Sequence, residues 1–209
     1  GHFQGPLMAE TVLGFLLAET RGIGDTLRAQ LAGSPWPREG IMHPMRALRG
    51  SHIMILGFGH IGEWIGRLAK PLGVRITGVR RHPGTPPDWF ETEDALVAAH
   101  RLDTLLPDVD HLVLVLPRDP STDHILDARR LSLLPDHAVV YNVGRGNAIE
   151  EEALAEALRE KRLAGAWLDV FEEEPLPEDS PLRTAPRCTL MPHASAIAPN
   201  YMDLFVDEL

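Results

Sequence analysis

The chain has 209 residues, of which 44% are hydrophobic and 24% charged, as in an ordinary globular domain. Its formal net charge of −10 argues against a nucleic-acid-binding protein and against binding to an anionic membrane surface. The single cysteine, Cys188, excludes an internal disulfide, and no apolar run has the length of a membrane span, so a cytoplasmic location is expected.

The first 50 residues predict a helix followed by a loop. Apolar residues recur every three or four positions from Leu7 to Leu31, which is typical of a helix. Gly22 and Gly24 predict a break or kink in that helix, and the segment Gly33–Pro37 ends it. A loop then runs to about Gly50.

Beyond that loop, short apolar strands alternate with helices, which predicts a parallel sheet with right-handed crossovers. The predicted strands are His52–Leu56, Val74–Val79, His111–Leu116, Ala138–Asn142, Ala164–Val170 and Thr189–Met191. The predicted helices are Ile61–Leu72, Leu96–Leu106 (in short pieces), Asp127–Leu134, Glu150–Arg162 and the start of one at Pro199–Leu209, with a loop over Glu172–Pro186. We therefore predict an α/β fold with a doubly wound parallel sheet, a Rossmann fold, whose core is residues 51–209.

A glycine-rich turn follows the first predicted strand and matches the pattern G-x-G-x-x-G at residues 57–62. Gly57 permits the sharp turn, Gly59 lets the backbone approach a pyrophosphate, and Gly62 lets helix and strand pack closely. His60 and Ile61 open the helix, where free N–H groups and the helix dipole favour a phosphate. The pattern predicts a dinucleotide site; the alternative is a structural turn that binds nothing.

The end of the second predicted strand bears on the choice between NAD and NADP. An acidic residue there would bind the ribose 2′-hydroxyl, but this strand is followed by Arg80 and Arg81. Two guanidinium groups suit a 2′-phosphate, so the sequence favours NADP(H), with NAD(H) left open. The competing interpretation is a solvated pair of surface arginines.

Three loops place further polar side chains directly after apolar strands. They are Asn142–Gly146, Leu168–Pro177 and Met191–His193. Because ligands bind beyond the carboxyl ends of parallel strands, we expect these loops to converge in space.

Taken together, these motifs resemble the D-isomer-specific 2-hydroxyacid dehydrogenase family over nearly the whole chain. The resemblance begins at Met8-Ala9-Glu10, continues through the glycine turn and Leu116-Pro117 with Thr122, and ends at Pro192-His193. Within the family, the arginine pair and the run Pro186–Ala198 look most like the glyoxylate/hydroxypyruvate reductases.

The resemblance implies three catalytic residues. Arg145 would bind the substrate carboxylate and the reacting carbonyl, for which a forked guanidinium is suited. His193 would be the acid–base group, since imidazole titrates near neutrality. Glu174, which directly precedes a proline as in the family motif, would hydrogen-bond His193 and fix its tautomer, although Glu172 and Glu173 stand beside it.

The resemblance also implies the residues around the cofactor. Asp169 would contact the nicotinamide carboxamide. The other residues expected to line the cofactor are Leu116, Pro117, Thr122, Val143 and Ser195. No metal ion is expected.

The expected function is NAD(P)H-dependent reduction of a small 2-oxo acid, glyoxylate or hydroxypyruvate, to the D-2-hydroxy acid. Two alternatives stay open: a dinucleotide sensor of the same fold that binds partner proteins without catalysis, and another D-2-hydroxyacid enzyme such as a phosphoglycerate dehydrogenase. Family members have a further segment before this one that forms most of a substrate domain, so we expect this chain to lack that domain and to be inactive alone. The helix in residues 1–50 lies at a dimer interface in the family, so a homodimer is expected.

Overall fold

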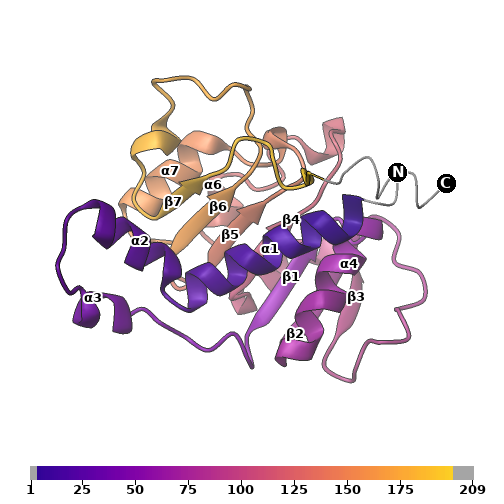
Figure 1. Cartoon of the computed structure of the whole chain (residues 1–209). Coiled ribbons are helices and arrows are strands. Elements are labelled where there is room, and N and C mark those ends of the chain that lie inside the picture. The colour runs from indigo at the N-terminus through magenta and orange to yellow at the C-terminus, as the bar shows by residue number, and fades with distance from the viewer. Residues whose placement is uncertain (1–3, 200–209) are drawn as a thin grey trace.

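The computed structural model describes residues 4–199 and shows one seven-stranded sheet in which every neighbouring pair of strands is parallel (Figure 1). The strand order is β3-β2-β1-β4-β5-β6-β7. The strands are β1 His52–Leu56, β2 Arg75–Arg80, β3 Ala95–Ala98, β4 His111–Leu114, β5 Val139–Asn142, β6 Gly165–Leu168 and β7 Cys188–Leu190. This is the predicted doubly wound parallel sheet.

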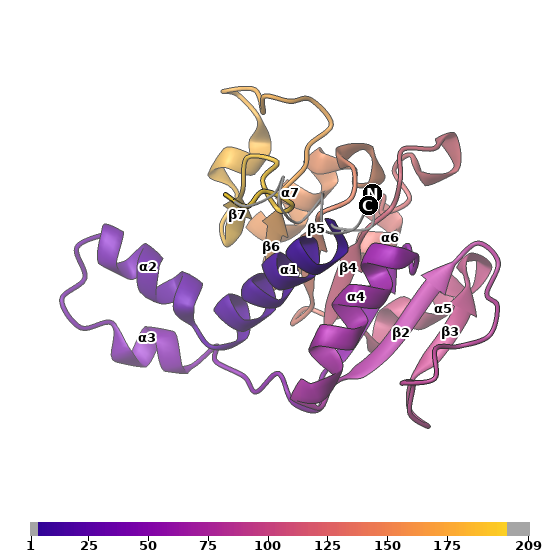
Figure 2. The ribbon, with the colours of Figure 1, turned by 45° about the vertical axis from the view of Figure 1, so that its right-hand side comes forward.

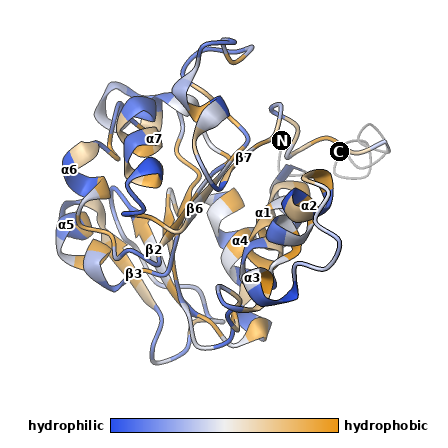
Figure 3. Cartoon of the chain, turned by 90° about the vertical axis from the view of Figure 1, so that its left-hand side faces the viewer, coloured by the Kyte–Doolittle hydropathy of each residue, from blue (hydrophilic) through white to orange (hydrophobic). Residues whose placement is uncertain are grey.

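Helices cover both faces of the sheet, and the edge-on view of Figure 3 separates the two layers. The α-helices are α1 Gln4–Thr20, α2 Ile23–Leu31, α3 Arg38–Met42, α4 His60–Ala69, α5 Leu102–Leu105, α6 Ala128–Leu131 and α7 Glu151–Arg159. One layer holds α1 to α4, and the other holds α5, α6 and α7. Short 3-10 helices lie at Lys70–Leu72, Ala99–Arg101, Leu106–Asp108, Pro120–Thr122, Gly146–Ala148 and Pro181–Thr184.

Alternate side chains of the central strands pack into two separate cores, one on each face of the sheet. In β1, Met54 and Leu56 pack with α5, α6 and α7, whereas Ile53 and Ile55 pack with α1 and α4. All four side chains are at most 1% exposed. A strand buried on both faces is an apolar run without alternation, which explains why the sequence pattern identified these strands.

Most predicted elements are confirmed, but two predictions are wrong. Residues Ala95–Ala98 form the edge strand β3, paired in parallel with β2, where a helical piece was predicted from residue 96 onward. The predicted loop before Gly50 contains the short helix α3. The predicted helix at Pro199–Leu209 lies outside the described residues except for its first position.

The predicted break in the N-terminal helix falls at Gly22, whose φ of 66° is left-handed and separates α1 from α2. Helix α1 packs against α4, while α2 and α3 extend away from the body (Figure 2). Along residues 4–199, we find no helix with the combination of length and apolarity needed to cross a bilayer.

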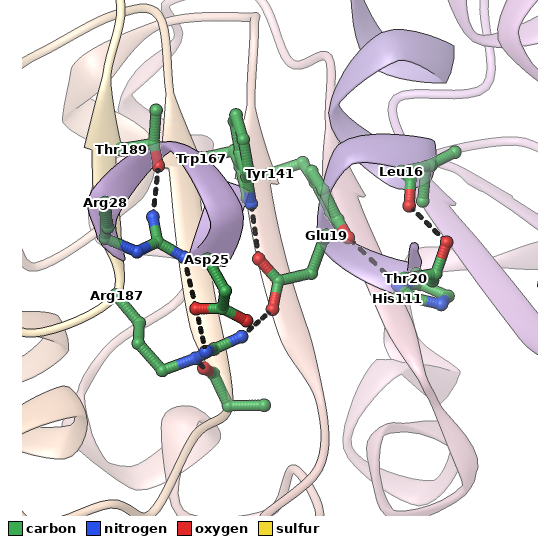
Figure 4. Close-up of polar contacts among 11 residues, drawn as sticks. Leu16, Glu19, Thr20, Asp25, Arg28, His111, Tyr141, Trp167, Arg187 and Thr189 are labelled. Atoms are coloured by element: carbon green, nitrogen blue, oxygen red, sulfur yellow. Dashed lines mark hydrogen bonds and ion pairs between the residues drawn. The ribbon is translucent and has the colours of Figure 1, made fainter. Parts of the chain in front are cut away.

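A polar network fixes α1 and α2 to the sheet (Figure 4). The Glu19 carboxylate accepts a hydrogen bond from the Trp167 indole at 2.9 Å and forms an ion pair with Arg187. Arg187 also contacts Asp25 of α2 at 2.6 Å, and Arg28 reaches the same carboxylate at 3.0 Å. Since Glu19 is only 8% exposed, these hydrogen bonds and the ion pair satisfy the polar atoms of a buried side chain.

The order of the strands determines where a ligand can bind. The chain crosses to one side from β1 to β2 and β3, and to the other side from β4 onward, so the order reverses between β1 and β4. At such a point the crossover helices diverge and leave a crevice beyond the carboxyl ends of the strands. The glycine turn directly follows β1 and therefore lies at this crevice.

Candidate active site

The glycine turn has the geometry that a pyrophosphate requires. Gly57 has a φ of 92°, and a Cβ there would overlap the carbonyl group of Val115. A Cβ at Gly62 would lie 2.6 Å from the Gly57 carbonyl oxygen, whereas one at Gly59 would meet nothing within 4 Å. The backbone is thus tightly packed on the inner side and open at Gly59. Helix α4 begins directly after Gly59 without a side-chain cap, and the positive end of a helix dipole favours a phosphate.

A cavity of about 390 Å³ extends from this turn across the ends of β1 and β2. Six of the predicted cofactor residues line it: Gly57, Gly59, Arg80, Arg81, Leu116 and Thr122. The Nε atom of Arg80 is buried without a hydrogen-bond partner among the described residues. An unsatisfied buried donor beside an open glycine backbone fits a ligand with phosphate and hydroxyl oxygens.

The loop after β4 closes one side of that cavity. Asp119 caps the 3-10 helix Pro120–Thr122, and its Oδ1 accepts a hydrogen bond from the Ser121 N–H at 2.9 Å. The buried Thr122 hydroxyl donates to the carbonyl oxygen of Pro117 at 3.0 Å. These bonds give the loop a defined shape, with Leu116 and Thr122 facing the cavity.

Arg145 is presented by a loop that two backbone contacts hold in place. The Asn142 side chain donates to the Arg145 carbonyl oxygen at 3.1 Å and accepts from the Gly144 N–H at 3.1 Å. A Cβ at Gly146 would overlap the backbone of Phe171, so only glycine lets this loop pack against the loop after β6. The exposed Arg145 guanidinium makes no ion pair within residues 4–199.

His193 and Glu174 form the predicted pair. The Nδ1–H of His193 donates to Oε2 of Glu174 at 2.6 Å, and the second carboxylate oxygen accepts from the Phe171 N–H at 3.0 Å. His193 adopts a left-handed φ of 50°, a conformation uncommon for residues other than glycine, and its N–H donates to the Asp169 carbonyl at 2.9 Å. With Nδ1 directed at Glu174, Nε2 is the nitrogen left for a substrate.

The carboxyl group of Glu174 is held in its charged form. Partial burial alone would raise its pKa, but the hydrogen bonds from His193 and Phe171 outweigh that effect and lower the pKa of Glu174 below its usual value. The positive charge of Arg145 acts in the same direction. The charged carboxylate of Glu174 accepts the hydrogen bond from Nδ1 of His193 and thereby fixes the orientation of the ring.

Asp169 has a structural role that the sequence did not suggest. Its side chain is fully buried, and its two oxygens accept hydrogen bonds from the N–H groups of Ala194 at 2.7 Å and Ser195 at 3.0 Å. The Ser195 carbonyl in turn accepts from the Thr11 hydroxyl of α1 at 2.9 Å. Asp169 and Ser195 thus fix the segment that carries His193; contact with a nicotinamide stays a prediction.

The structure brings the three predicted catalytic residues together. Arg145, Glu174 and His193 line one cavity of about 230 Å³. Other predicted residues pack around the sites instead of lining these cavities: Ile61 is half-buried, Val143 is 1% exposed, and the His60 ring lies against Trp64 at 6.5 Å between centroids. Their role as cofactor contacts stays a prediction.

Sequence reasoning missed three polar side chains of this 230 Å³ cavity, called the catalytic cavity below. Arg118 and Asn147 line it beside Arg145, and so does Glu172. Glu172 accepts a hydrogen bond from the His124 ring of the loop after β4, which ties that loop to the one after β6. Arg118 directly follows the Leu116-Pro117 motif, so its position in the chain was the signal available.

Comparison with known proteins identifies the family. The family model for the D-isomer specific 2-hydroxyacid dehydrogenase NAD binding domain matches residues 13–195. The seven-stranded parallel sheet, its glycine turn and the assembled arginine, glutamate and histidine agree with that match. The chain belongs to the D-isomer specific 2-hydroxyacid dehydrogenases and carries their NAD binding domain.

Relatives of this chain within the family are named for different substrates. The chain is 34% identical over 193 residues to an (S)-sulfolactate dehydrogenase of Chromohalobacter salexigens, covering 91% of the chain and 60% of the relative. It is 40% identical over 168 residues to a glyoxylate reductase of Thermococcus onnurineus, covering 77% of the chain and 48% of the relative. A family structure from Xanthobacter autotrophicus in complex with NADPH and MES is 32% identical with a TM-score of 0.81, over 98% of this chain and 62% of that one. The chain thus spans about half to two thirds of the length of these relatives.

Proposed function

We propose that the protein containing this chain reduces a small 2-oxo acid of the glyoxylate or hydroxypyruvate type to the D-2-hydroxy acid, using NAD(P)H. The observation that carries the proposal is the assembly of Arg145, Glu174 and His193 around one cavity. These residues come from three loops spread over 49 positions of the chain, at the carboxyl ends of β5, β6 and β7. A guanidinium, an imidazole and a charged carboxylate together can bind and protonate a 2-oxo acid.

In the proposed reaction Arg145 binds the substrate carboxylate and the carbonyl oxygen. A guanidinium without an ion pair can form a bidentate contact with a carboxylate, which orients the carbonyl group. As the carbonyl is reduced, negative charge develops on its oxygen, and the adjacent guanidinium stabilises that charge. The bound dinucleotide supplies the hydride that is added to the carbonyl carbon.

His193 completes the reduction by donating a proton from Nε2 to the carbonyl oxygen. Glu174 holds Nδ1 at 2.6 Å, so the ring presents Nε2 to the substrate. The lowered pKa of Glu174 keeps its carboxylate charged, so that it remains an acceptor for Nδ1 while Nε2 faces the substrate. The products are the 2-hydroxy acid and the oxidised cofactor, and the neutral ring regains a proton from solvent.

NADPH is the favoured cofactor in this proposal. Arg80 and Arg81 line the cavity beside the glycine turn, where they can contact a phosphate on the adenosine ribose. The relative from Xanthobacter autotrophicus was solved with NADPH, whereas the family model describes NAD binding. We therefore base the proposed preference for NADPH over NADH on Arg80 and Arg81.

The test is a panel of 2-oxo acids on the protein containing this chain, with each cofactor. We expect glyoxylate or hydroxypyruvate to oxidise NADPH faster than NADH. Faster turnover of sulfopyruvate or 3-phosphohydroxypyruvate would assign a substrate with a second anionic group. Binding of NADPH with no turnover of any 2-oxo acid would instead favour a dinucleotide sensor.

We also propose that the protein is a homodimer. Five large apolar side chains of the α2–α3 region are exposed, namely Ile23 (49%), Leu27 (56%), Leu31 (89%), Trp36 (80%) and Met42 (54%). Apolar surface gathered on a projecting segment fits burial against a second copy. Light scattering on the purified protein should give twice the monomer mass; a monomer at micromolar concentration would contradict it.

A further inference from the structure

A carboxylate lies opposite the proposed 2′-phosphate residues. The guanidinium of Arg81, which directly follows β2, contacts Ser121 in the loop after β4, and both residues line the 390 Å³ cavity. Its Nη2 donates to the Ser121 hydroxyl at 3.1 Å and lies 3.5 Å from Oδ1 of Asp119. The Ser121 hydroxyl donates in turn to the same Asp119 oxygen at 2.5 Å.

Asp119 is charged at neutral pH. Hydrogen bonds from the Ser121 hydroxyl and N–H, followed by the charge of Arg81, lower the pKa of Asp119 below its usual value. The carboxylate therefore neutralises part of the charge of Arg81 in the described conformation. A 2′-phosphate that needs Arg81 must compete with this negative group, whereas a ribose hydroxyl can donate a hydrogen bond to it.

We propose that Asp119 is a specificity residue that weakens NADPH relative to NADH by competing with the 2′-phosphate for Arg81. This inference rests on the proposed dinucleotide site. Arg81 is the member of the arginine pair affected, since Arg80 has no ion pair in the described part of the chain and its Nε is buried without a partner. The pocket thus has one arginine ready for a phosphate and one held by an internal carboxylate.

The solvent exposure of Arg81 and Asp119 limits how strongly Asp119 can change the ratio of NADPH to NADH affinity. The side chain of Arg81 is 64% exposed and that of Asp119 is 39% exposed, so water and salt screen their attraction. Exposed ion pairs contribute little, which limits the effect of Asp119 on the affinity ratio to about 5-fold. An effect of this size shifts the preference between NADPH and NADH without preventing the binding of either.

The experiment measures dissociation constants of NADPH and NADH by calorimetric titration at fixed ionic strength. Asp119→Asn is the informative variant, because asparagine also caps helices and keeps an acceptor oxygen for Ser121. We expect it to raise the affinity ratio of NADPH to NADH measurably, by up to about 5-fold. Asp136→Asn is the control, because it removes the same charge from an 87% exposed side chain. Asp136 precedes β5 and so lies at the amino-terminal ends of the strands, away from the cavity at the glycine turn, and its substitution should leave the ratio unchanged.

A second pair of variants tests whether Asp119 acts through Arg81. In Arg81→Gln protein, adding Asp119→Asn should give a clearly smaller gain, because no guanidinium is left to release. An unchanged ratio in Asp119→Asn, an equal gain in Asp136→Asn, or an equal gain with and without Arg81 would overturn the inference while the proposed function stands. Failure of the wild-type protein to bind either dinucleotide would overturn both.

Discussion

The imidazole of His193 is fixed through both its side chain and its backbone. Glu174 accepts from Nδ1 at 2.6 Å, while the Asp169 carbonyl accepts from the His193 N–H at 2.9 Å. The side chain of Asp169 holds the next two residues in addition. At the scale of single residues, the proposed acid–base group therefore depends on two carboxylates with different roles.

The role of Glu174 predicts the behaviour of Glu174→Gln. An amide cannot replace the charged acceptor of the Nδ1 hydrogen bond, so the rate of reduction should fall by about 10- to 100-fold, a fraction of the roughly 10²- to 10⁴-fold that general acid–base catalysis contributes. Dissociation constants for NADPH should change little, because the Glu174 carboxylate is hydrogen-bonded to His193 and to the Phe171 N–H and does not line the cavity at the glycine turn. Stopped-flow rates and calorimetric titration measure the two quantities.

Glu173→Gln is the matched control for that change. Glu173 is exposed, and it lines neither the catalytic cavity nor the cavity at the glycine turn. Its substitution should leave the rate of reduction near that of the wild type. Equal losses in both variants, or no loss in Glu174→Gln, would exclude the proposed pairing with His193.

The sequence predicted the proposed catalytic residues of the site better than the residues that hold them in position. Arg145, Glu174 and His193 stand in ordered motifs, and the structure places them in one cavity. The bonds from Asp169 to backbone groups beyond His193 could not be predicted, because they join segments 25 and 26 positions apart through the fold. The pairing of Arg81 with Asp119 likewise depends on the relative placement of two loops.

At the scale of elements, the catalytic loops depend on close backbone packing. The Arg145 loop touches the backbone of Phe171, and a Cβ at Gly146 would overlap it. Gly146→Ala should therefore separate the two loops, lower the free energy of unfolding by about 1 to 3 kcal/mol and impair reduction. Chemical denaturation and the rate of reduction measure both effects.

Gly14→Ala is the control for Gly146→Ala. A Cβ at Gly14 in α1 would meet nothing within 4 Å, and alanine is the better helix former. Stability should thus stay the same or rise by up to about 1 kcal/mol. A Gly146→Ala protein as stable and active as the Gly14→Ala protein would contradict the packing argument.

The prediction of elements failed where local preference and tertiary pairing conflict. Ala95–Ala98 has the sequence Ala-Leu-Val-Ala, and alanine and leucine favour helices. The segment is nevertheless a strand, because its backbone pairs with Thr77–Arg80 of β2 at the edge of the sheet. By contrast, β1 and β4 are fully buried apolar runs, so their pattern alone was sufficient.

At the scale of the whole molecule, buried histidines make stability depend on pH. Burial lowers the pKa of His111, at the start of β4, from its usual value near 6.5 to about 4, and burial also lowers the pKa of His52 in β1. Between those values the unfolded chain binds more protons than the folded protein. The contribution of neutral His111 is therefore complete above pH 6.5 and is lost as the pH falls toward 4.

For His111 alone, this linkage is worth about 2 kcal/mol between pH 7.5 and pH 5. In His111→Asn protein, the free energy of unfolding should fall by about 2 kcal/mol less over that interval than in the wild type, as measured by urea denaturation. His82→Asn changes an exposed side chain and should retain the full wild-type loss. An identical loss in all three proteins would show that His111 does not carry the effect.

The central claim concerns the whole molecule: one dinucleotide lies across the carboxyl ends of β1 and β4 and presents its nicotinamide to Arg145, Glu174 and His193. The most direct measurement is a crystal structure of the protein with NADPH. We expect the pyrophosphate at the Gly59 backbone, the adenosine ribose beside Arg80 and Arg81, and the nicotinamide at the cavity of the three catalytic residues. A dinucleotide bound elsewhere, or one whose nicotinamide lies away from that cavity, would contradict the account.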